Sequence, residues 1–199
     1  QFSGDEQMYY QYNAIGGKEQ GGALANRLVV WAYFDLEALL KIKGSAINVS
    51  GAWYIGNDIN DNIGAIFAPN ASFKESQVRL FELYWHQKFA KNQFDVIAGR
   101  ITIGPGEFGT SPYFYDFPTA AISSSPGAWF TNMPVTTQSL AVATWGIRIL
   151  FAPKDKDFNV RFGVYNGSPI DNADPAVGGV DFSMHLDSST FFMGEFAYK

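Results

Sequence analysis

The sequence lacks the residues on which most catalytic and metal sites depend. It contains no cysteine and only two histidines, His86 and His185. A cysteine nucleophile is therefore excluded, and a zinc site effectively so, because zinc is held mainly by thiolates and imidazoles. No G-x-S-x-G sequence marks the nucleophile of a serine hydrolase. We expect neither an enzyme nor a bound metal or other cofactor.

Charged residues are scarce, and long apolar runs are missing. Only 17% of the 199 residues are charged, whereas about 25% is typical of soluble domains, and 47% are hydrophobic. The 14 Lys and Arg are scattered and the net charge is −5, which gives no basic patch for nucleic acid. The longest clean apolar run, 28–34, is far shorter than the roughly 20 residues of a membrane-spanning helix. The apolar excess must face a large core or a non-aqueous neighbour.

Stretches rich in β-branched and aromatic residues, bounded by turn residues, predict seven strands and a weaker eighth at 7–13. The seven are 28–40, 45–55, 78–89, 93–103, 139–152, 158–166 and 190–199. Short connections at 41–44, 90–92 and 153–157 alternate with long ones at 56–77, 104–138 and 167–189. Strands of about ten residues suit a tilted membrane strand. Together these features predict an all-β, antiparallel outer-membrane β-barrel with short periplasmic turns and long extracellular loops.

Apolar and polar residues alternate within these strands, as membrane barrel strands require. In 78–89 the apolar phase holds Phe81, Leu83, Trp85 and Phe89. Strand 93–103 mixes its two phases, which a β-bulge would reconcile. Four phenylalanines flank the short turns where an interfacial girdle belongs: Phe89, Phe94, Phe151 and Phe158. A soluble β-sandwich is the rival, because alternation alone does not tell which face meets lipid.

The polar phases gather a set of planar charged groups and rings that would face the lumen. Its members are Arg100, Arg148, Arg161, Asp35, Glu37, Glu82, Glu195, His86, Trp31, Tyr33, Tyr84 and Tyr165. Guanidinium and carboxylate groups make paired hydrogen bonds to neighbouring hydroxyls, and ring faces cover apolar C–H surfaces. These residues would therefore bind sugars, or they would simply solvate an aqueous pore and pair across strands.

Two short motifs resemble ligand sites without completing them. Residues 104–109 fit G-x-G-x-x-G after a strand, but no helix follows to hold a pyrophosphate. Residues 58–62 resemble the start of a calcium loop, yet Ile63 and Pro69 occupy the places of the required Gly and Glu. We therefore expect residues 58–62 to form a plain polar loop, or one that binds a surface cation loosely.

Several segments, in this order along residues 26–199, resemble the carbohydrate-selective porins of the OprB type. They are Asp35–Glu37, Leu80–Phe89, Phe94–Arg100, Phe108–Tyr113, Ser125–Gly127, Trp145–Arg148, Phe158–Gly167 and Gly194–Tyr198. The resemblance implies a barrel of about sixteen strands in a Gram-negative outer membrane, usually a homotrimer surrounded by lipid, passing glucose and other small sugars passively. It also implies a loop folded into the pore.

We place that loop at 104–135, with Tyr113, Tyr115, Asp116 and Trp129 as candidate constriction residues, or else packed against a neighbouring protomer. Because the chain offers seven or eight strands, we expect 1–199 to be a single domain that forms part of the barrel, with N- and C-terminal parts missing. A closed eight-stranded barrel is the alternative, but side chains would fill its lumen. The alternatives to sugar transport are a general or ion-permeable porin and a mainly structural envelope protein.

Overall fold

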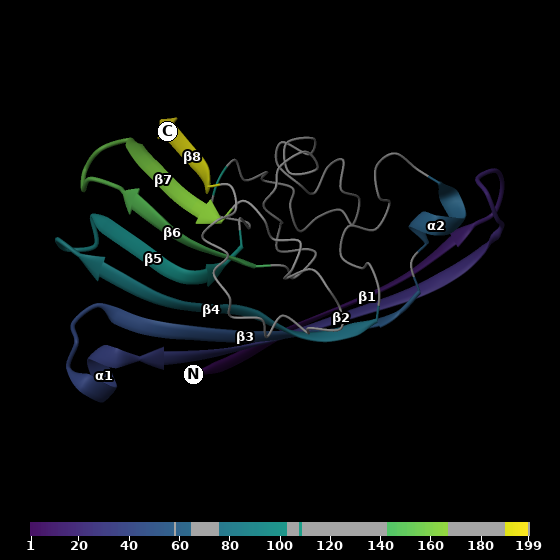
Figure 1. Ribbon diagram of the computed structural model, residues 1–199, viewed down its shortest axis with the longest axis horizontal. Coiled ribbons are helices and arrows are strands. Elements are labelled where there is room, and N and C mark those ends of the chain that lie inside the picture. The colour runs from purple at the N-terminus through teal and green to yellow at the C-terminus, as the bar shows by residue number, and fades with distance from the viewer. Residues whose placement is uncertain (58, 65–75, 103–107, 109–142, 167–189, 199) are drawn as a thin grey trace.

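The computed structural model describes residues 1–57, 59–64, 76–102, 108, 143–166 and 190–198, which form one curved antiparallel sheet of eight strands (Figure 1). The strands follow chain order, so each pairs only with its neighbours in sequence. Their bounds are β1 Phe2–Asn13, β2 Gly21–Asp35, β3 Ser45–Gly56, β4 Gln77–Phe89, β5 Phe94–Ile101, β6 Thr144–Phe151, β7 Phe158–Asn166 and β8 Thr190–Tyr198. Each of the eight predicted segments contains a strand, while positions 103, 139–142 and 199 of these predictions lie outside the described residues. Strands β1 and β8 are the two edges of the described sheet.

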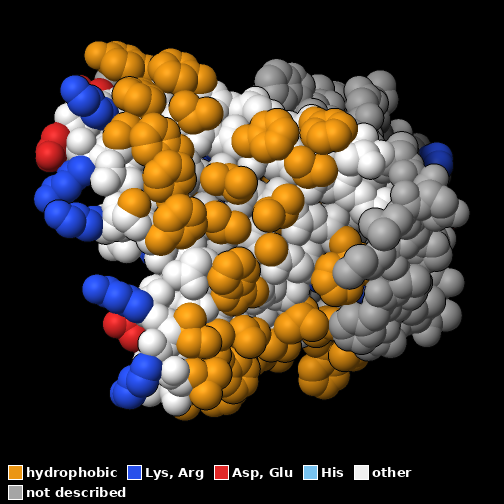
Figure 2. Space-filling model, turned by 60° about the vertical axis from the view of Figure 1, so that its left-hand side comes forward, with side chains coloured by type: hydrophobic (Ala, Val, Ile, Leu, Met, Phe, Trp, Pro, Cys, Tyr) orange, Lys and Arg blue, Asp and Glu red, His pale blue; other side chains and the backbone are white. Residues whose placement is uncertain are grey.

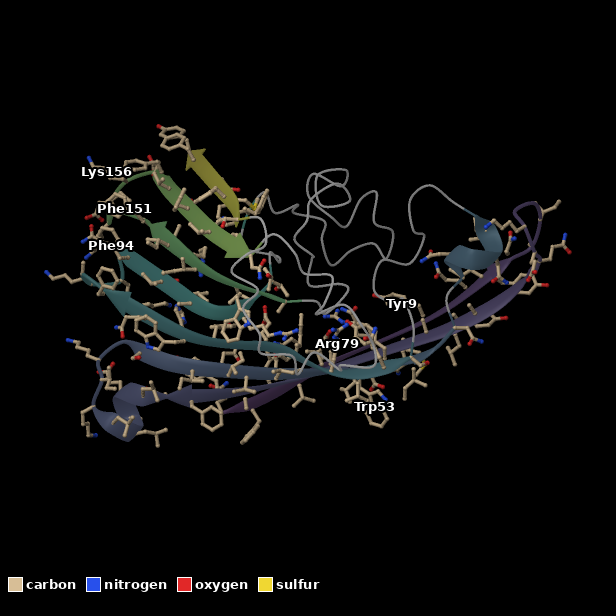
Figure 3. The ribbon with its side chains drawn as sticks, viewed as in Figure 1. Tyr9, Trp53, Arg79, Phe94, Phe151 and Lys156 are labelled. Atoms are coloured by element: carbon tan, nitrogen blue, oxygen red, sulfur yellow. The ribbon has the colours of Figure 1, made fainter. Side chains whose placement is uncertain are left out.

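The two faces of the sheet carry different side chains. Trp53 lies on the convex face, whereas Tyr9 and Arg79 lie on the concave one (Figure 3). Exposed apolar residues occupy the convex phase of strands β2 to β4 and β6 to β8, among them Leu24, Val30, Trp53, Trp85, Ile147, Ile149, Val160, Phe162, Phe192 and Phe196. In Figure 2 hydrophobic side chains spread over the strands, and charged ones gather along one edge. The convex face is therefore suited to lipid.

A helix interrupts the segment predicted as one strand, 28–40. Residues Leu36–Leu40 form α1, and the Asp35 side chain accepts hydrogen bonds from the backbone N–H groups of Glu37 and Ala38 at 2.9 and 3.1 Å. Asp at an N-cap followed by good helix formers favours this short turn of helix. The prediction is wrong for 36–40, so Leu36 and Glu37 do not belong to the faces of a strand.

A β-bulge lies in β4 rather than in β5. The register of β4 with β3 shifts between Ser50 and Gly51, so that Phe81 is the additional residue, and the β5 pairs show no such shift. Phe81 is fully buried with Val29 and Tyr54. It was predicted to share the lipid-facing phase of Leu83; that is wrong, because the bulge reverses the phase at this point.

Aromatic rings form a continuous ladder across β4 to β8 beside the short turns. Ring centroids are separated by 5.2 Å for Phe89–Phe94, 4.7 Å for Phe94–Phe151, 6.5 Å for Phe151–Phe158 and 5.8 Å for Phe158–Phe196. These pairs confirm that the four predicted phenylalanines lie side by side. They have the position of an interfacial girdle.

The opposite end of the sheet carries the β1–β2 turn and a second short helix, α2, Asn60–Ile63. Backbone N–H groups of Lys18 and Glu19 donate to the Asn62 carbonyl at 2.8 and 3.0 Å, which joins the two segments. Neither helix of the described chain is long and apolar enough to cross a membrane.

Candidate pore lining

The two kinds of basic residue occupy different parts of the chain. All five arginines of the sequence lie in strands: Arg27, Arg79, Arg100, Arg148 and Arg161. The first four are buried and the fifth is partly buried. Among the described lysines only Lys88 lies in a strand, one residue from its end. A guanidinium presents several donors in a fixed plane, so this distribution equips the sheet for directional hydrogen bonding.

One polar group lies towards the end that carries the long connections. Arg27 and Tyr54 are register partners on β2 and β3, and the Tyr54 hydroxyl interacts electrostatically with both Arg27 and Arg79. Arg27 Nη1 donates to Gln7 Oε1 at 3.4 Å, and Arg79 Nη1 donates to Gln77 Oε1 at 3.0 Å. Side chains from β1 to β4 thus hold two guanidinium groups against the concave wall, where Figure 3 places Arg79.

Glu82 connects this group to β5. Its Oε1 accepts from Thr102 Oγ1 at 2.7 Å and from the Thr102 backbone N–H at 3.3 Å. The backbone N–H of Glu82 donates to Ser50 Oγ at 3.1 Å. Arg27 is the nearby charge that favours the carboxylate. The bulge at Phe81 is what directs Glu82 to this buried side.

A second polar group lies towards the short turns and centres on Asp95. Its Oδ2 is 2.8 Å from His86 Nε2, and its Oδ1 is 3.1 Å from Arg148 Nη2. Lys88 Nζ is 4.0 Å from the same carboxylate. One anion therefore joins side chains of β4, β5 and β6, and it partly neutralises two permanent cations.

A third group lies on the last two strands. Arg161 Nη1 donates to Glu195 Oε1 at 2.8 Å, and the two residues are register partners on β7 and β8. The Arg161 guanidinium carbon is 5.7 Å from the centroid of the Phe108 ring, within cation–π range. Phe108 packs edge-on to Tyr165 and is buried. This described residue of the β5–β6 connection therefore lies against the strand wall.

Aromatic residues complete the concave face. Trp31 packs against the cluster formed by Val29, Tyr54 and Phe81, and Tyr84 packs against a second cluster that holds Ile97 and Tyr165. The Asn48 amide donates to the Tyr84 hydroxyl at 2.6 Å. These rings alternate with the charged groups, as a surface for both hydroxyl and C–H contacts requires.

The predicted site residues fall into four classes. Glu82, His86, Arg148, Arg161, Glu195, Trp31 and Tyr84 belong to the groups described above. Arg100 lies opposite Leu83 and Trp145 in the register and is completely buried. Asp35 caps α1 at the end of β2, so the structure gives it a local structural role. Tyr113, Tyr115, Asp116 and Trp129 lie outside the described residues.

The residues of these groups that were not predicted include Arg27, Tyr54, Arg79 and Asp95. Arg27 lies just before the predicted strand 28–40. The alternation of that strand continues back from Trp31 to residue 27 and could have placed Arg27 on the polar face. Arg79 shares its odd position with Leu83 and Trp85, and only the bulge separates them. Tyr54 shares its phase with Asn48 and Ser50 on β3, while Asp95 lies in the strand whose phases are mixed.

Comparison with known proteins places this geometry in context. Residues 19–199 match the model of a family described as carbohydrate-selective porin, OprB family. The fold matches a high-pH structure of OprB from Pseudomonas putida with a TM-score of 0.86 and 19% sequence identity. That match covers 100% of this chain and 47% of the other, so the chain spans about half the length of the solved protein. A search of curated proteins found no match.

Proposed function

This chain belongs to the carbohydrate-selective porin family OprB, and from that premise we propose that the protein carrying it lets small sugars such as glucose diffuse passively through the outer membrane. The chain is part of an outer-membrane β-barrel. Passive diffusion requires no covalent step, so we propose that the protein is not an enzyme. The supporting arguments come from the concave face.

The observation that carries the proposal is the alternation of guanidinium–carboxylate pairs with aromatic rings on one face of the sheet. Arg161 with Glu195, and Arg148 with Asp95, present donors and acceptors close together. A sugar offers adjacent hydroxyls that both donate and accept, together with an apolar C–H side. Each of these polar groups already has a protein partner. Replacing that partner by a sugar hydroxyl therefore changes the free energy only slightly. Weak binding of this kind lets the solute leave again.

We further propose the wider architecture that the family resemblance implies. About sixteen strands would close the barrel, to which this chain contributes eight, and the match to 47% of the solved OprB is in keeping with that share. A homotrimer within the lipid is part of the proposal. So is a loop at 104–135 that narrows the pore, which the packing of Phe108 against Tyr165 and Arg161 supports.

Liposome swelling with the full-length protein tests the sugar function. Neutral sugars should enter faster than amino acids of matched size, and equal rates would contradict selectivity. Arg148→Ala and Arg161→Ala should change the sugar rate, as should Arg100→Ala if that side chain lines the constriction. Ile147→Ala and Phe162→Leu, which alter convex neighbours of two of these arginines, should leave it unchanged. Unaltered flux in all three arginine variants would reject the proposed lining.

An ion-permeable porin is the second candidate, because all five arginines of the sequence lie in strands and give the sheet fixed positive charges. Glu82, Asp95 and Glu195 are the carboxylates placed near arginines within the described strands. Reversal potentials in a salt gradient separate the two functions. Strong anion permeability without discrimination among sugars would favour the ion-permeable porin, and the absence of any flux would favour a structural envelope role.

A further inference from the structure

Five lysines stand at the end of the sheet where the short turns lie. Lys41 and Lys43 belong to the β2–β3 connection, Lys91 to the β4–β5 turn, and Lys154 and Lys156 to the β6–β7 turn. All five are exposed, and none forms an ion pair with another described residue. Figure 3 labels Lys156 at this end, and Figure 2 shows Lys and Arg side chains projecting along one edge. We name these five residues the lysine rim.

Three of the five rim lysines lie directly beyond the aromatic ladder, and the other two lie on the adjacent β2–β3 connection. Phe89 and Phe94 flank the turn that holds Lys91. Phe151 and Phe158 flank the turn that holds Lys154 and Lys156. Aromatic girdles sit at the boundary between hydrocarbon and headgroups. A lysine just outside that boundary extends its amine into the headgroup layer while its methylenes stay against apolar surface.

The backbone shows that lysine occupies some of these positions against local preference. Lys41 has φ 63° and Lys91 has φ 57°, both in the left-handed region where glycine is the favoured residue. Gly44, in the same connection as Lys41, has φ 69° and follows that preference. Ala90, Asn92 and Asp155 in these turns also have positive φ, so the conformation belongs to the turns, and the inference rests on charge and position instead.

The rim is positive although the chain as a whole is negative. Three carboxylates share these turns: Glu37, Asp155 and Asp157. Glu37 accepts a hydrogen bond from the Gly44 backbone N–H at 2.8 Å. The other two carboxylates, Asp155 and Asp157, have no such described role. By contrast, residues 57–76, 102–143 and 167–189 together contain nine carboxylates and one lysine. In sequence, the long connections are therefore acidic, whereas the short turns are basic.

We propose that the lysine rim binds the headgroups of anionic phospholipids, of the phosphatidylglycerol type, in the leaflet that surrounds the short turns. Charge complementarity and position select this partner: the amines are unpaired, on adjacent hairpins, and at the depth that the aromatic ladder assigns to lipid phosphates. Each lysine near an anionic surface adds to the attraction, which salt screens. This inference does not depend on what the pore transports.

Binding of short-chain phosphatidylglycerol and phosphatidylcholine with identical acyl chains, measured by native mass spectrometry on the full-length protein in detergent, tests the proposal. The wild-type protein should retain phosphatidylglycerol in preference, and added salt should weaken that preference. Replacing all five rim lysines by Gln should reduce phosphatidylglycerol affinity about tenfold or more, with little change for phosphatidylcholine. Lys154→Gln/Lys156→Gln, which alters one turn only, should give part of this loss if the five-fold variant does not fold.

Lys18→Gln is the matched control, because Lys18 is an exposed lysine of the β1–β2 turn at the opposite end of the sheet. It should bind phosphatidylglycerol as the wild-type protein does. Equal retention of the two lipids by the wild-type protein would overturn the proposal. Unchanged affinity in the rim variants, or an equal loss in Lys18→Gln, would overturn it as well.

Discussion

The ring of Tyr165 fills the space beside Gly163, two residues earlier in the same strand. A Cβ built on Gly163 would stand 2.6 Å from the Tyr165 hydroxyl oxygen, and one on Gly146 of the neighbouring β6 would stand 2.5 Å from Tyr165 Cδ1. Two glycines on adjacent strands therefore let one buried ring lie flat against the concave wall. Phe108 packs edge-on against this ring and covers it, so the position of Tyr165 sets the position of Phe108.

A methyl group at either glycine should displace that ring. Gly163→Ala and Gly146→Ala are expected to lower single-channel conductance, because the displaced Tyr165 ring would push Phe108 away from the strand wall, and to destabilise the barrel by about 1–3 kcal/mol through overpacking. Gly194→Ala in β8 is the control, since a Cβ there meets nothing within 4 Å. Equal conductance in all three variants would show that Tyr165 does not bound the pore.

Removing the ring at the bulge should destabilise the protein. Phe81 is fully buried among Val29, Tyr54 and Ala52. Phe81→Ala should therefore cost about 3–5 kcal/mol of unfolding free energy, measured by urea unfolding from vesicles. Val78→Ala, which truncates an exposed residue of the same strand, should cost much less. Similar losses in both variants would contradict the inward position of Phe81.

Neutralising Asp95 should change ion selectivity. Its carboxylate lies 3.1 Å from Arg148 and 4.0 Å from Lys88, so Asp95→Asn removes a negative charge beside two cations near the short-turn mouth. The chloride-to-potassium permeability ratio, taken from reversal potentials, is expected to rise. Asp155→Asn removes an exposed carboxylate from the adjacent β6–β7 turn and should leave the ratio as it was. No change in Asp95→Asn would place this group away from the ion path.

Arg161 and Glu195 should be energetically coupled. They are register partners joined at 2.8 Å, and both are mostly buried. A double-mutant cycle of Arg161→Ala and Glu195→Ala on stability should give a coupling of about 1 kcal/mol. Additive effects would mean that each side chain is stabilised by other contacts. A control cycle pairs Glu195→Ala with a replacement of Phe162, which lies on the opposite face of β7. The effects of these two changes on stability should be additive.

Asp35 should matter for stability and not for transport. Asp35→Ala removes the acceptor for two backbone N–H groups of α1, which is worth about 1 kcal/mol. Asp35→Asn keeps an effective cap and should restore most of that stability. Sugar flux should be the same in both variants. A flux change in Asp35→Asn with stability intact would return Asp35 to the pore lining.

Strand positions were predictable because each strand separates an apolar face from a polar one. Phe158–Asn166 was predicted to the residue, with Arg161 and Tyr165 on one side and Val160 on the other. In such a strand the sequence indicates which residues share a face, because period-two alternation has only two phases. The resemblance to a porin family then selected lipid rather than a soluble core for the apolar side.

Local exceptions were not predictable for a physical reason. The segment after Asp35 satisfies strand alternation and helix propensity equally well, and the choice depends on a capping hydrogen bond. Phe81 and Leu83 look equivalent in sequence, yet one additional residue opposite Ser50 and Gly51 places them on opposite faces. The role of Asp95 in a polar group could not be predicted, because it depends on β4 and β6 bringing His86 and Arg148 beside it.

The free edges of β1 and β8 set a condition on how such a sheet can enter a membrane. Within the described residues neither edge has a partner for its outward backbone N–H and C=O groups. In hydrocarbon each unsatisfied group costs several kcal/mol, and an edge of this length carries many of them. Insertion and edge pairing must therefore proceed together. For a sheet with two such edges in a bilayer, insertion and edge pairing are expected to occur in one step, so a kinetic assay of insertion would also report edge pairing.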